Sequence, residues 1–194
     1  MRRALTAITI AACFAISAAA QTGTWQIDPN HSNPQFSVRH LGISTVRGSF
    51  SKVNGTVQYD PADLSKTAID ASIDTTSIST GNDSRDKDLR SANYFDVEKF
   101  PAITFKSKRA ESAGPGKLKI TGDLTIKGVT KEVVLNVDGP SDTVKDPRGN
   151  MHMGAEATTK VARKDFGVGP STPLVGDDIT ITIDVELVKQ AAGR

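Results

Sequence analysis

The sequence predicts an all-β fold of about eight antiparallel strands, arranged as a barrel or a sandwich, with one short helix at about residues 82–92. Apolar and polar residues alternate most regularly over residues 117–126 and 179–187, a pattern typical of strands with one buried face. Turn-forming pairs such as Asn54-Gly55 and Gly139-Pro140 separate the alternating segments. Strands joined by short turns, each with one polar face, indicate an antiparallel barrel or sandwich.

Weaker alternation marks the other strands that we expect. It covers residues 35–39, 69–74, 103–106 and 133–138. Residues 82–92 break the pattern and read NDSRDKDLRSA, with acidic residues early and Arg90 late. Because the helix dipole favours charges in that order, we expect a short helix here, lying across an opening of the β structure.

Residues 1–20 are predicted to be a secretory signal peptide, followed by a single domain over residues 21–194. A basic start precedes an apolar stretch and the small-residue site Ala18-Ala19-Ala20, which is the three-part pattern of such peptides. Alternatively, Cys13 is the lipidated N-terminus of a lipoprotein. We therefore expect a periplasmic or secreted protein. No later stretch approaches the roughly 20 apolar residues of a membrane span, so we expect no stable span.

Charge and motif content argue against several function classes. Removing Arg2 and Arg3 from the 24 basic residues leaves 22, equal to the 22 acidic ones, so the basic excess of a nucleic-acid binder is missing. The motifs of serine hydrolases, phosphate-binding loops and dinucleotide-binding folds are absent from the sequence. The three histidines show no metal-ligand spacing. We therefore expect a protein that is not an enzyme and that has no metal and no cofactor.

The apolar faces of the strands predict a lumen that holds an apolar ligand. Small residues such as Gly48, Ala71 and Gly122 fall on these faces, and the chain has only seven Phe, two Tyr and one Trp, whereas large aromatics fill wide barrels most efficiently. An alkyl or isoprenoid chain suits an uncharged interior, since each buried methylene contributes about 0.8 kcal/mol. A core packed by its own side chains gives the same alternation and stays as the alternative. The expected lumen residues are Phe36, Val38, Phe50, Ile73, Ile103, Phe105, Leu118, Ile120, Leu124 and Ile126.

Polar residues near the ends of these segments are candidates for the mouth of the lumen. His31 is either a turn residue or a polar contact for the ligand at the mouth. His40 lies at the end of a strand and is an even number of residues from Phe36, so it can point inward as Phe36 does. Arg85 either pairs with Asp86 or meets a phosphate or carbonyl oxygen of the ligand, and Arg163 has the same two interpretations.

Four blocks of the sequence resemble the YceI-like family. They are residues 25–50, which begin Trp25-Gln26-Ile27-Asp28-Pro29-Asn30-His31-Ser32, and residues 84–101, 122–130 and 163–167. The resemblance implies an extended, lipocalin-like, eight-stranded antiparallel barrel, often exported to the periplasm, that holds a polyisoprenoid lipid such as a prenyl-quinone precursor. Two positions depart from the family pattern. Asp88 stands where His is common, which weakens a charge-based headgroup contact at the helix, and Pro34 replaces an apolar residue, so the strand there begins at Gln35 or lies at an edge.

Two other functions stay open from the sequence. One is an isomerase or hydrolase that acts on a hydrophobic substrate in the same lumen, with His40 as base. The other is a structural or stress-related protein with a filled barrel and no ligand. We also consider a homodimer, in which a long chain that leaves the mouth enters a second subunit.

Overall fold

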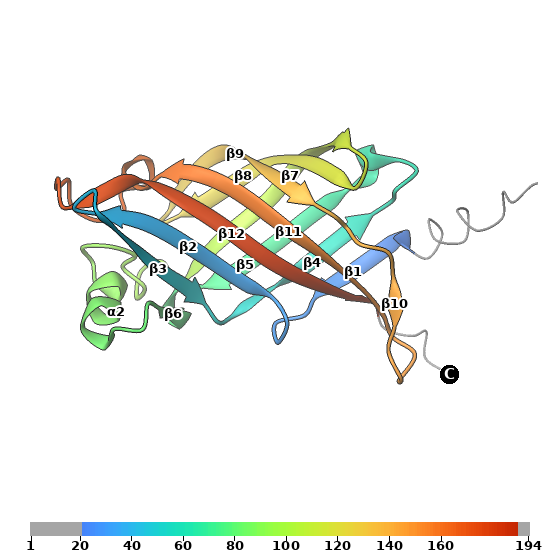
Figure 1. Ribbon diagram of the computed structural model, residues 1–194, viewed down its shortest axis with the longest axis horizontal. Helices are drawn as coiled ribbons and strands as arrows, with labels where there is room; N and C mark the ends of the chain where they lie inside the picture. The colour runs from blue at the N-terminus through green and yellow to red at the C-terminus, as the bar shows by residue number, and fades with distance from the viewer. Residues whose placement is uncertain (1–20, 190–194) are drawn as a thin grey trace, which may run out of the picture.

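The computed structural model describes residues 21–189, which form a closed antiparallel β-barrel with one α-helix (Figure 1). The strand segments are hydrogen-bonded in the order β10-β11-β9-β8-β7-β5-β4-β1-β12-β2-β3-β6. An additional pairing of β11 with β12 closes the barrel. The predicted signal peptide and Cys13 lie outside the described residues.

Three strands of the barrel are interrupted, and each appears as two segments. They are β1 (Gly23–Ile27) with β2 (Asn33–His40), β3 (Ser44–Phe50) with β4 (Val53–Tyr59), and β5 (Ala68–Asp74) with β6 (Ile78–Ser79). β1 and β2 follow one another as antiparallel partners of β12. Likewise β4 pairs with β5, and β3 pairs with β6.

The other five strands of the barrel are long and uninterrupted. They are β7 (Ala102–Gly114), β8 (Lys117–Ile126), β9 (Val129–Asp138), β11 (Met151–Ala162) and β12 (Val175–Lys189). The short β10 (Val144–Lys145) pairs with the start of β11. When each interrupted pair is taken as one strand, the closed barrel has eight strands, so the predicted eight-stranded antiparallel barrel is confirmed.

The predicted helix is α2 (Asp83–Arg90), slightly shorter than expected. Asn82 caps it, because its Oδ1 accepts a hydrogen bond from the backbone N–H of Arg85 at 3.0 Å. Buried Asp86 ties the helix to the segment after β6 by accepting hydrogen bonds from the backbone N–H and the hydroxyl of Thr80, at 2.9 and 2.5 Å. α2 therefore lies across one end of the barrel (Figure 1). Three short 3₁₀ helices span Leu64–Lys66, Thr75–Ser77 and Arg163–Phe166.

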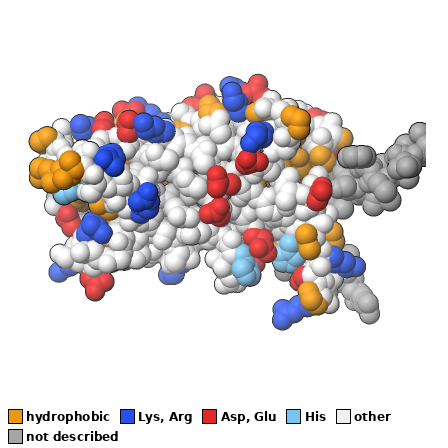
Figure 2. All heavy atoms as spheres, in the orientation of Figure 1, with side chains coloured by type: hydrophobic (Ala, Val, Ile, Leu, Met, Phe, Trp, Pro, Cys, Tyr) orange, Lys and Arg blue, Asp and Glu red, His pale blue; other side chains and the backbone are white. Residues whose placement is uncertain are grey.

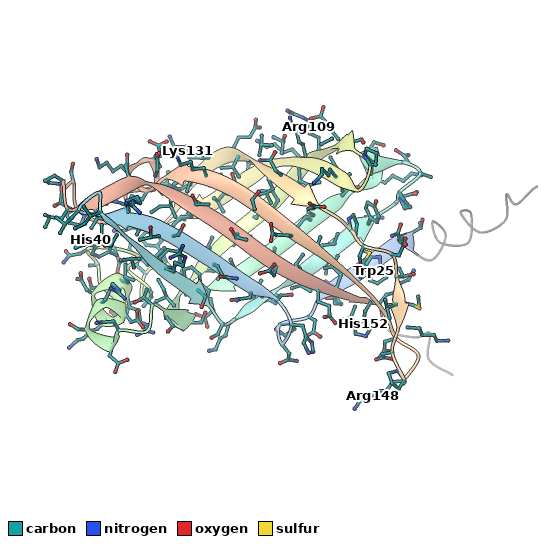
Figure 3. The ribbon with its side chains drawn as sticks, in the orientation of Figure 1. Trp25, His40, Arg109, Lys131, Arg148 and His152 are labelled. Atoms are coloured by element: carbon teal, nitrogen blue, oxygen red, sulfur yellow. The ribbon has the colours of Figure 1, made fainter. Side chains whose placement is uncertain are left out.

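The end of the barrel opposite α2 is filled by its own side chains. Trp25 is completely buried there and donates its indole N–H to the carbonyl of Gln21 at 2.8 Å (Figure 3). The register places buried Leu187 opposite both Ile27 and buried Met153. We call this region, with buried Tyr59, the packed end. The space available to a ligand must therefore lie between the packed end and α2.

Charged side chains are spread over the outer surface, whereas exposed hydrophobic side chains gather at the two ends of the view, one group at the α2 end and another at the opposite end (Figure 2). This distribution follows from the alternation, since the polar residues of each strand face outward. Among the described residues, no helix has the length and apolar character needed to cross a membrane.

Candidate functional site

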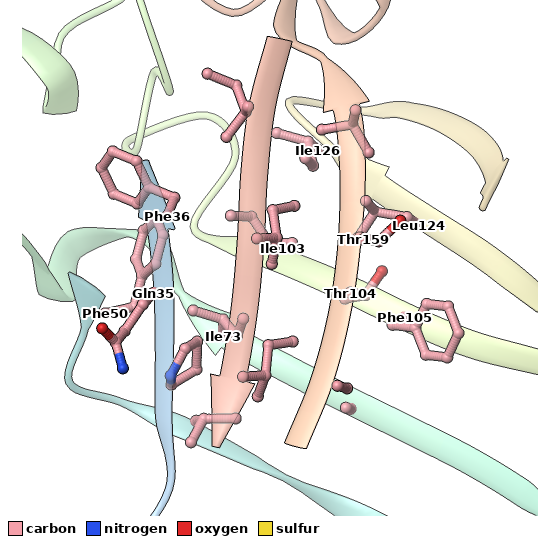
Figure 4. Close-up of a pocket in the computed structure, with 18 of the residues that line it drawn as sticks. Gln35, Phe36, Phe50, Ile73, Ile103, Thr104, Phe105, Leu124, Ile126 and Thr159 are labelled. Carbon is pink, nitrogen blue, oxygen red and sulfur yellow. The ribbon is translucent and has the colours of Figure 1, made fainter. Parts of the chain in front are cut away.

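The middle of the barrel contains a cavity of about 240 Å³ with an almost entirely apolar wall (Figure 4). For comparison, an engineered apolar cavity of about 150 Å³ holds benzene. Leu89 of α2 and Tyr94 and Phe95 in the following loop line the cavity at the α2 end. The alternative interpretation of the alternation required a barrel that is filled throughout by its own side chains. The cavity shows that the middle of the barrel is not filled in this way.

The sequence-derived lumen residues divide into two groups. Eight of the ten line the cavity, namely Phe36, Val38, Phe50, Ile73, Ile103, Phe105, Leu124 and Ile126. Leu118 and Ile120 are not among the lining residues, although both are buried. They lie on the part of β8 next to the β7–β8 turn, towards the packed end (Figure 1). Alternation correctly gives the inward face of β8, but it does not say where along the barrel axis the packing ends and the cavity begins.

One wall of the cavity was not selected as a site from the sequence. β12 contributes five lining residues, Val175 at its start and, in regular alternation, Ile179, Ile181, Ile183 and Val185. The period-two pattern of residues 179–187 marked this inward face, so the pattern could have identified it as lumen wall. The aromatic pair Tyr94 and Phe95 had no comparable pattern, because it lies in a loop that only the fold brings against the cavity.

The glycines on the inward faces do not make the room for a ligand. A Cβ atom on Gly48 would lie 2.4 Å from Cζ of Phe36, and one on Gly122 would lie 2.5 Å from Cζ of Phe105. The space above each glycine is therefore occupied by an aromatic ring from the neighbouring strand. Because glycine has no side chain, the rings of Phe36 and Phe105 can lie over Gly48 and Gly122, along the wall of the cavity and not across it.

The two histidines expected at the mouth do not line the cavity. His31 is exposed in the turn after β1, where its Nδ1 lies 2.9 Å from Oδ2 of Asp28. This hydrogen bond raises the pKa of the imidazole. His40 is half-buried at the end of β2, at the α2 end of the barrel (Figure 3). Its parity matches that of Phe36, but the strand ends beyond the cavity wall, so neither histidine is a wall residue, and a contact of either with a ligand at the mouth stays a prediction.

The sequence suggested that Arg85 pairs with Asp86, but in the structure Arg85 bonds a different residue. Its Nε donates to the hydroxyl of Thr80 at 2.7 Å, and its Nη2 donates to the carbonyl of the same residue at 3.0 Å. Asp86 also bonds Thr80. Both charged side chains thus fasten α2 to one threonine, and Arg85 is not a lining residue of the cavity.

Arg163 is the one predicted mouth residue that lines the cavity. It is 5% exposed and follows β11, in the 3₁₀ helix Arg163–Phe166. Its guanidinium donates to four backbone carbonyls, two in the loop before β12 and two in the first residues of β12, at distances of 2.8 to 3.2 Å. The acceptors are the carbonyls of Val168, Pro170, Val175 and Gly176. Arg163 therefore organises the loop at this end of the cavity, and no Asp or Glu in residues 21–189 forms an ion pair with it.

Comparison with known proteins agrees with this architecture. The YceI-like domain model matches residues 25–187. A UPF0312 protein from Vibrio cholerae is 36% identical over 170 residues, which cover 87% of this chain and 89% of that protein.

Two solved structures share the fold. The Campylobacter jejuni YceI protein aligns with a TM-score of 0.70 at 34% identity, over 79% of this chain and 90% of that one. A polyisoprenoid binding domain from Saccharophagus degradans aligns with a TM-score of 0.62 at 14% identity, over 84% of this chain and 97% of that one. At that identity the likeness shows the fold alone. The barrel, its cavity and the match over most of the sequence lead to one conclusion: this chain belongs to the YceI-like family.

Proposed function

We propose that this protein binds a long apolar lipid of the polyisoprenoid or prenyl-quinone class in the barrel cavity, and carries or stores it unchanged. The observation that carries the proposal is the apolar cavity of about 240 Å³ between the packed end and α2. A hydrocarbon chain needs no polar partner there, and each methylene it buries adds about 0.8 kcal/mol to binding. The name of the Saccharophagus degradans domain, which shares the fold, supports the polyisoprenoid class.

The composition of the wall favours binding over catalysis. Among the described lining residues there is no His, Asp, Glu, Lys or Cys, so the hydroxyl groups of Ser32, Thr104 and Thr159 have no general base in the wall to activate them as nucleophiles. Within residues 21–189, Arg163 is the only lining residue that carries a charge, and backbone carbonyls hold its guanidinium. His40, the base of the enzyme alternative, does not line the cavity. A periplasmic or extracellular location and a homodimer stay predictions.

A matched pair of variants tests whether the cavity is the ligand site. Ala157 of β11 lines the cavity and is 9% exposed. We expect Ala157→Phe to place a ring in the cavity and to weaken binding of a dansyl-labelled geranylgeraniol at least tenfold, measured by fluorescence titration. The free energy of unfolding should change by no more than about 1–3 kcal/mol, because the cavity can take up the ring.

The control places the same ring on the outer face of the same strand. Glu156 is exposed and precedes Ala157, so Glu156→Phe should bind the dansylated probe as the wild type does. Native mass spectrometry of purified wild-type protein should also detect co-purified prenyl lipid. Unchanged probe binding by Ala157→Phe would show that the ligand lies elsewhere.

Three exposed hydrophobic side chains at the α2 end suggest where the ligand enters. Leu41, Ile43 and Leu174, which we call the apolar tip, are 51%, 79% and 51% exposed, and hydrophobic side chains cluster at this end in Figure 2. The backbone N–H of Leu41 donates to the carbonyl of Leu174 at 2.8 Å, so the two turns lie side by side. Val175, next along the chain, lines the cavity. We infer that the apolar tip inserts into a membrane surface when the lipid is exchanged.

Substitution of the most exposed residue of the tip tests this entry route. Ile43→Glu should slow transfer of dansyl-labelled geranylgeraniol from phosphatidylglycerol-containing vesicles to the protein at least tenfold, because a carboxylate opposes insertion into the membrane interface. Binding of the same probe without vesicles should be unchanged. The control is Val144→Glu, which alters a 67% exposed hydrophobic residue of β10, near the other end of the barrel. Equal transfer rates for the two variants would rule out the tip as the entry point.

A further inference from the structure

A cluster of titratable side chains outside the cavity is unaccounted for by lipid binding. On the outer surface, Nδ1 of His31 lies 2.9 Å from Oδ2 of Asp28 and 4.0 Å from Oε1 of Glu186. One atom from each of these three side chains lies within 4.8 Å of the other two. Asp28 and His31 belong to the turn between β1 and β2, whereas Glu186 lies near the end of β12. The fold thus brings together residues from opposite ends of the sequence.

We propose that Asp28, His31 and Glu186 form a binding site for a divalent transition-metal ion of the Zn²⁺ type. One imidazole nitrogen and two carboxylates are ligands that Zn²⁺ accepts, and three protein ligands leave the fourth position for water. Zn–N and Zn–O bonds of about 2.0–2.2 Å place tetrahedral ligand atoms roughly 3.3–3.6 Å apart. Nδ1 of His31 lies 2.9 Å from Oδ2 of Asp28 and 4.0 Å from Oε1 of Glu186, one distance below that range and one above it. Side-chain rotations can therefore bring these atoms to the separations that a bound Zn²⁺ requires.

The backbone around the three ligands holds their positions. The N–H of Asp28 donates to the carbonyl of Glu186 at 2.9 Å. The buried hydroxyl of Ser32 accepts from the N–H of Glu186 at 3.0 Å and lies 3.3 Å from the carbonyl of the same residue. Oδ1 of Asp28 accepts from the N–H of Asn30 at 2.8 Å, which leaves Oδ2 directed at His31. Preorganised ligands reduce the ordering cost of binding a metal.

His152 acts as a positioning residue for the site. Its Nδ1 lies 2.8 Å from Oε1 of Glu186, and its Nε2 lies 3.3 Å from Oδ2 of Asp146 (Figure 3 labels His152). Burial raises the pKa of Asp146, but hydrogen bonds to its carboxylate outweigh this effect and lower the pKa to about 2. The donors are the side chain and backbone of Asn150, the His152 side chain and the Arg148 backbone. Asp146 therefore orients His152, which in turn orients Glu186, as supporting side chains around metal ligands commonly do.

Isothermal titration of the metal-free, untagged protein with ZnCl2 tests the proposal. We expect one equivalent to bind, with affinity reduced at least tenfold in His31→Ala and in Glu186→Gln. His152→Gln should weaken binding 10- to 100-fold, the range typical of residues that support a metal ligand. MgCl2 should give no binding, because Mg²⁺ prefers oxygen ligands in an octahedron. The matched control is His40→Ala, which removes the one histidine of the sequence other than His31 and His152 and should bind Zn²⁺ normally.

A second readout keeps the metal site separate from lipid binding. Saturating Zn²⁺ should raise the Tm of the wild type, because a ligand of the native state stabilises it, and this rise should disappear in Asp28→Asn. Both proteins should bind dansyl-labelled geranylgeraniol equally. The metal-site proposal would be overturned if the wild type did not bind Zn²⁺, or if His31→Ala, Glu186→Gln and Asp28→Asn all bound it with wild-type affinity. Neither result would bear on the proposed lipid binding.

Discussion

Replacement of Arg163 by Met is expected to lower the free energy of unfolding by about 3–5 kcal/mol, equivalent to two hydrogen bonds from a charged donor at about 1.5–3 kcal/mol each. The guanidinium is 5% exposed and donates to four carbonyls of residues 168–176, which form the loop before β12 and the start of that strand. Methionine matches much of the side-chain volume but donates no hydrogen bond. The carbonyls would lose their donors in a partly buried environment, where an unsatisfied polar group is costly.

Urea denaturation followed by circular dichroism measures this loss. The neighbouring Lys164 has an exposed side chain, so Lys164→Met should change the free energy of unfolding by no more than about 0.5 kcal/mol. The same loop lines the end of the cavity through Val168 and Val175, so Arg163→Met should also weaken lipid binding. A stability loss below about 1 kcal/mol would mean that the loop keeps its shape without the arginine.

Trp25→Ala is expected to cost a similar amount, about 3–5 kcal/mol, as large-to-small changes at buried aromatic residues do. The indole is completely buried at the packed end, and its N–H bonds the carbonyl of Gln21. Neighbouring side chains come from several strands of a closed barrel, so they have little freedom to collapse into the vacated volume. Most of the lost volume should remain as an extension of the cavity.

Two measurements separate the effects of this substitution. Urea denaturation gives the stability, and Trp25→Phe serves as the conservative variant, since it keeps an aromatic ring and loses only the N–H donor and part of the volume. We expect Trp25→Phe to cost about 1–2 kcal/mol. If the packed end limits the length of the bound chain, Trp25→Ala should bind a longer prenyl alcohol relative to the wild type. Equal stability of the two variants would contradict tight packing at this end.

The sequence was sufficient to predict the inward face of the strands whose residues alternate, because alternation reports directly on the two sides of a sheet. It correctly assigned Phe105 and Leu124 to the inward face, and both line the cavity. It could not place Ile120 outside the cavity, since the depth of a residue along the barrel depends on the stagger between strands and on bulky neighbours such as Trp25. Local patterns carry no information on that stagger.

Side chains that bond the backbone or distant carboxylates were the other source of error. Arg163 meets its carbonyl acceptors only when the loop before β12 folds around it. His152 belongs to no recognisable motif in the sequence, yet it bonds Glu186 and Asp146. Likewise His31 and Glu186 are remote in sequence and meet because β1 pairs with β12. Spacing rules for metal ligands apply within one loop or helix, so they miss a cluster that is assembled by strand pairing.

Pairing between the first and the last strand has a kinetic consequence. Gln26 lies opposite Val188, and Ile27 lies opposite Leu187, so the barrel cannot close until β12 is free to pair. Before that moment β1 and β11 each present an unpaired edge, which is open to wrong partners. Contacts this distant in sequence also place folding in the slow range of milliseconds to seconds. We therefore expect the unfolded chain to depend on chaperones that shield strand edges until β12 pairs with β11 on one side and with β1 and β2 on the other.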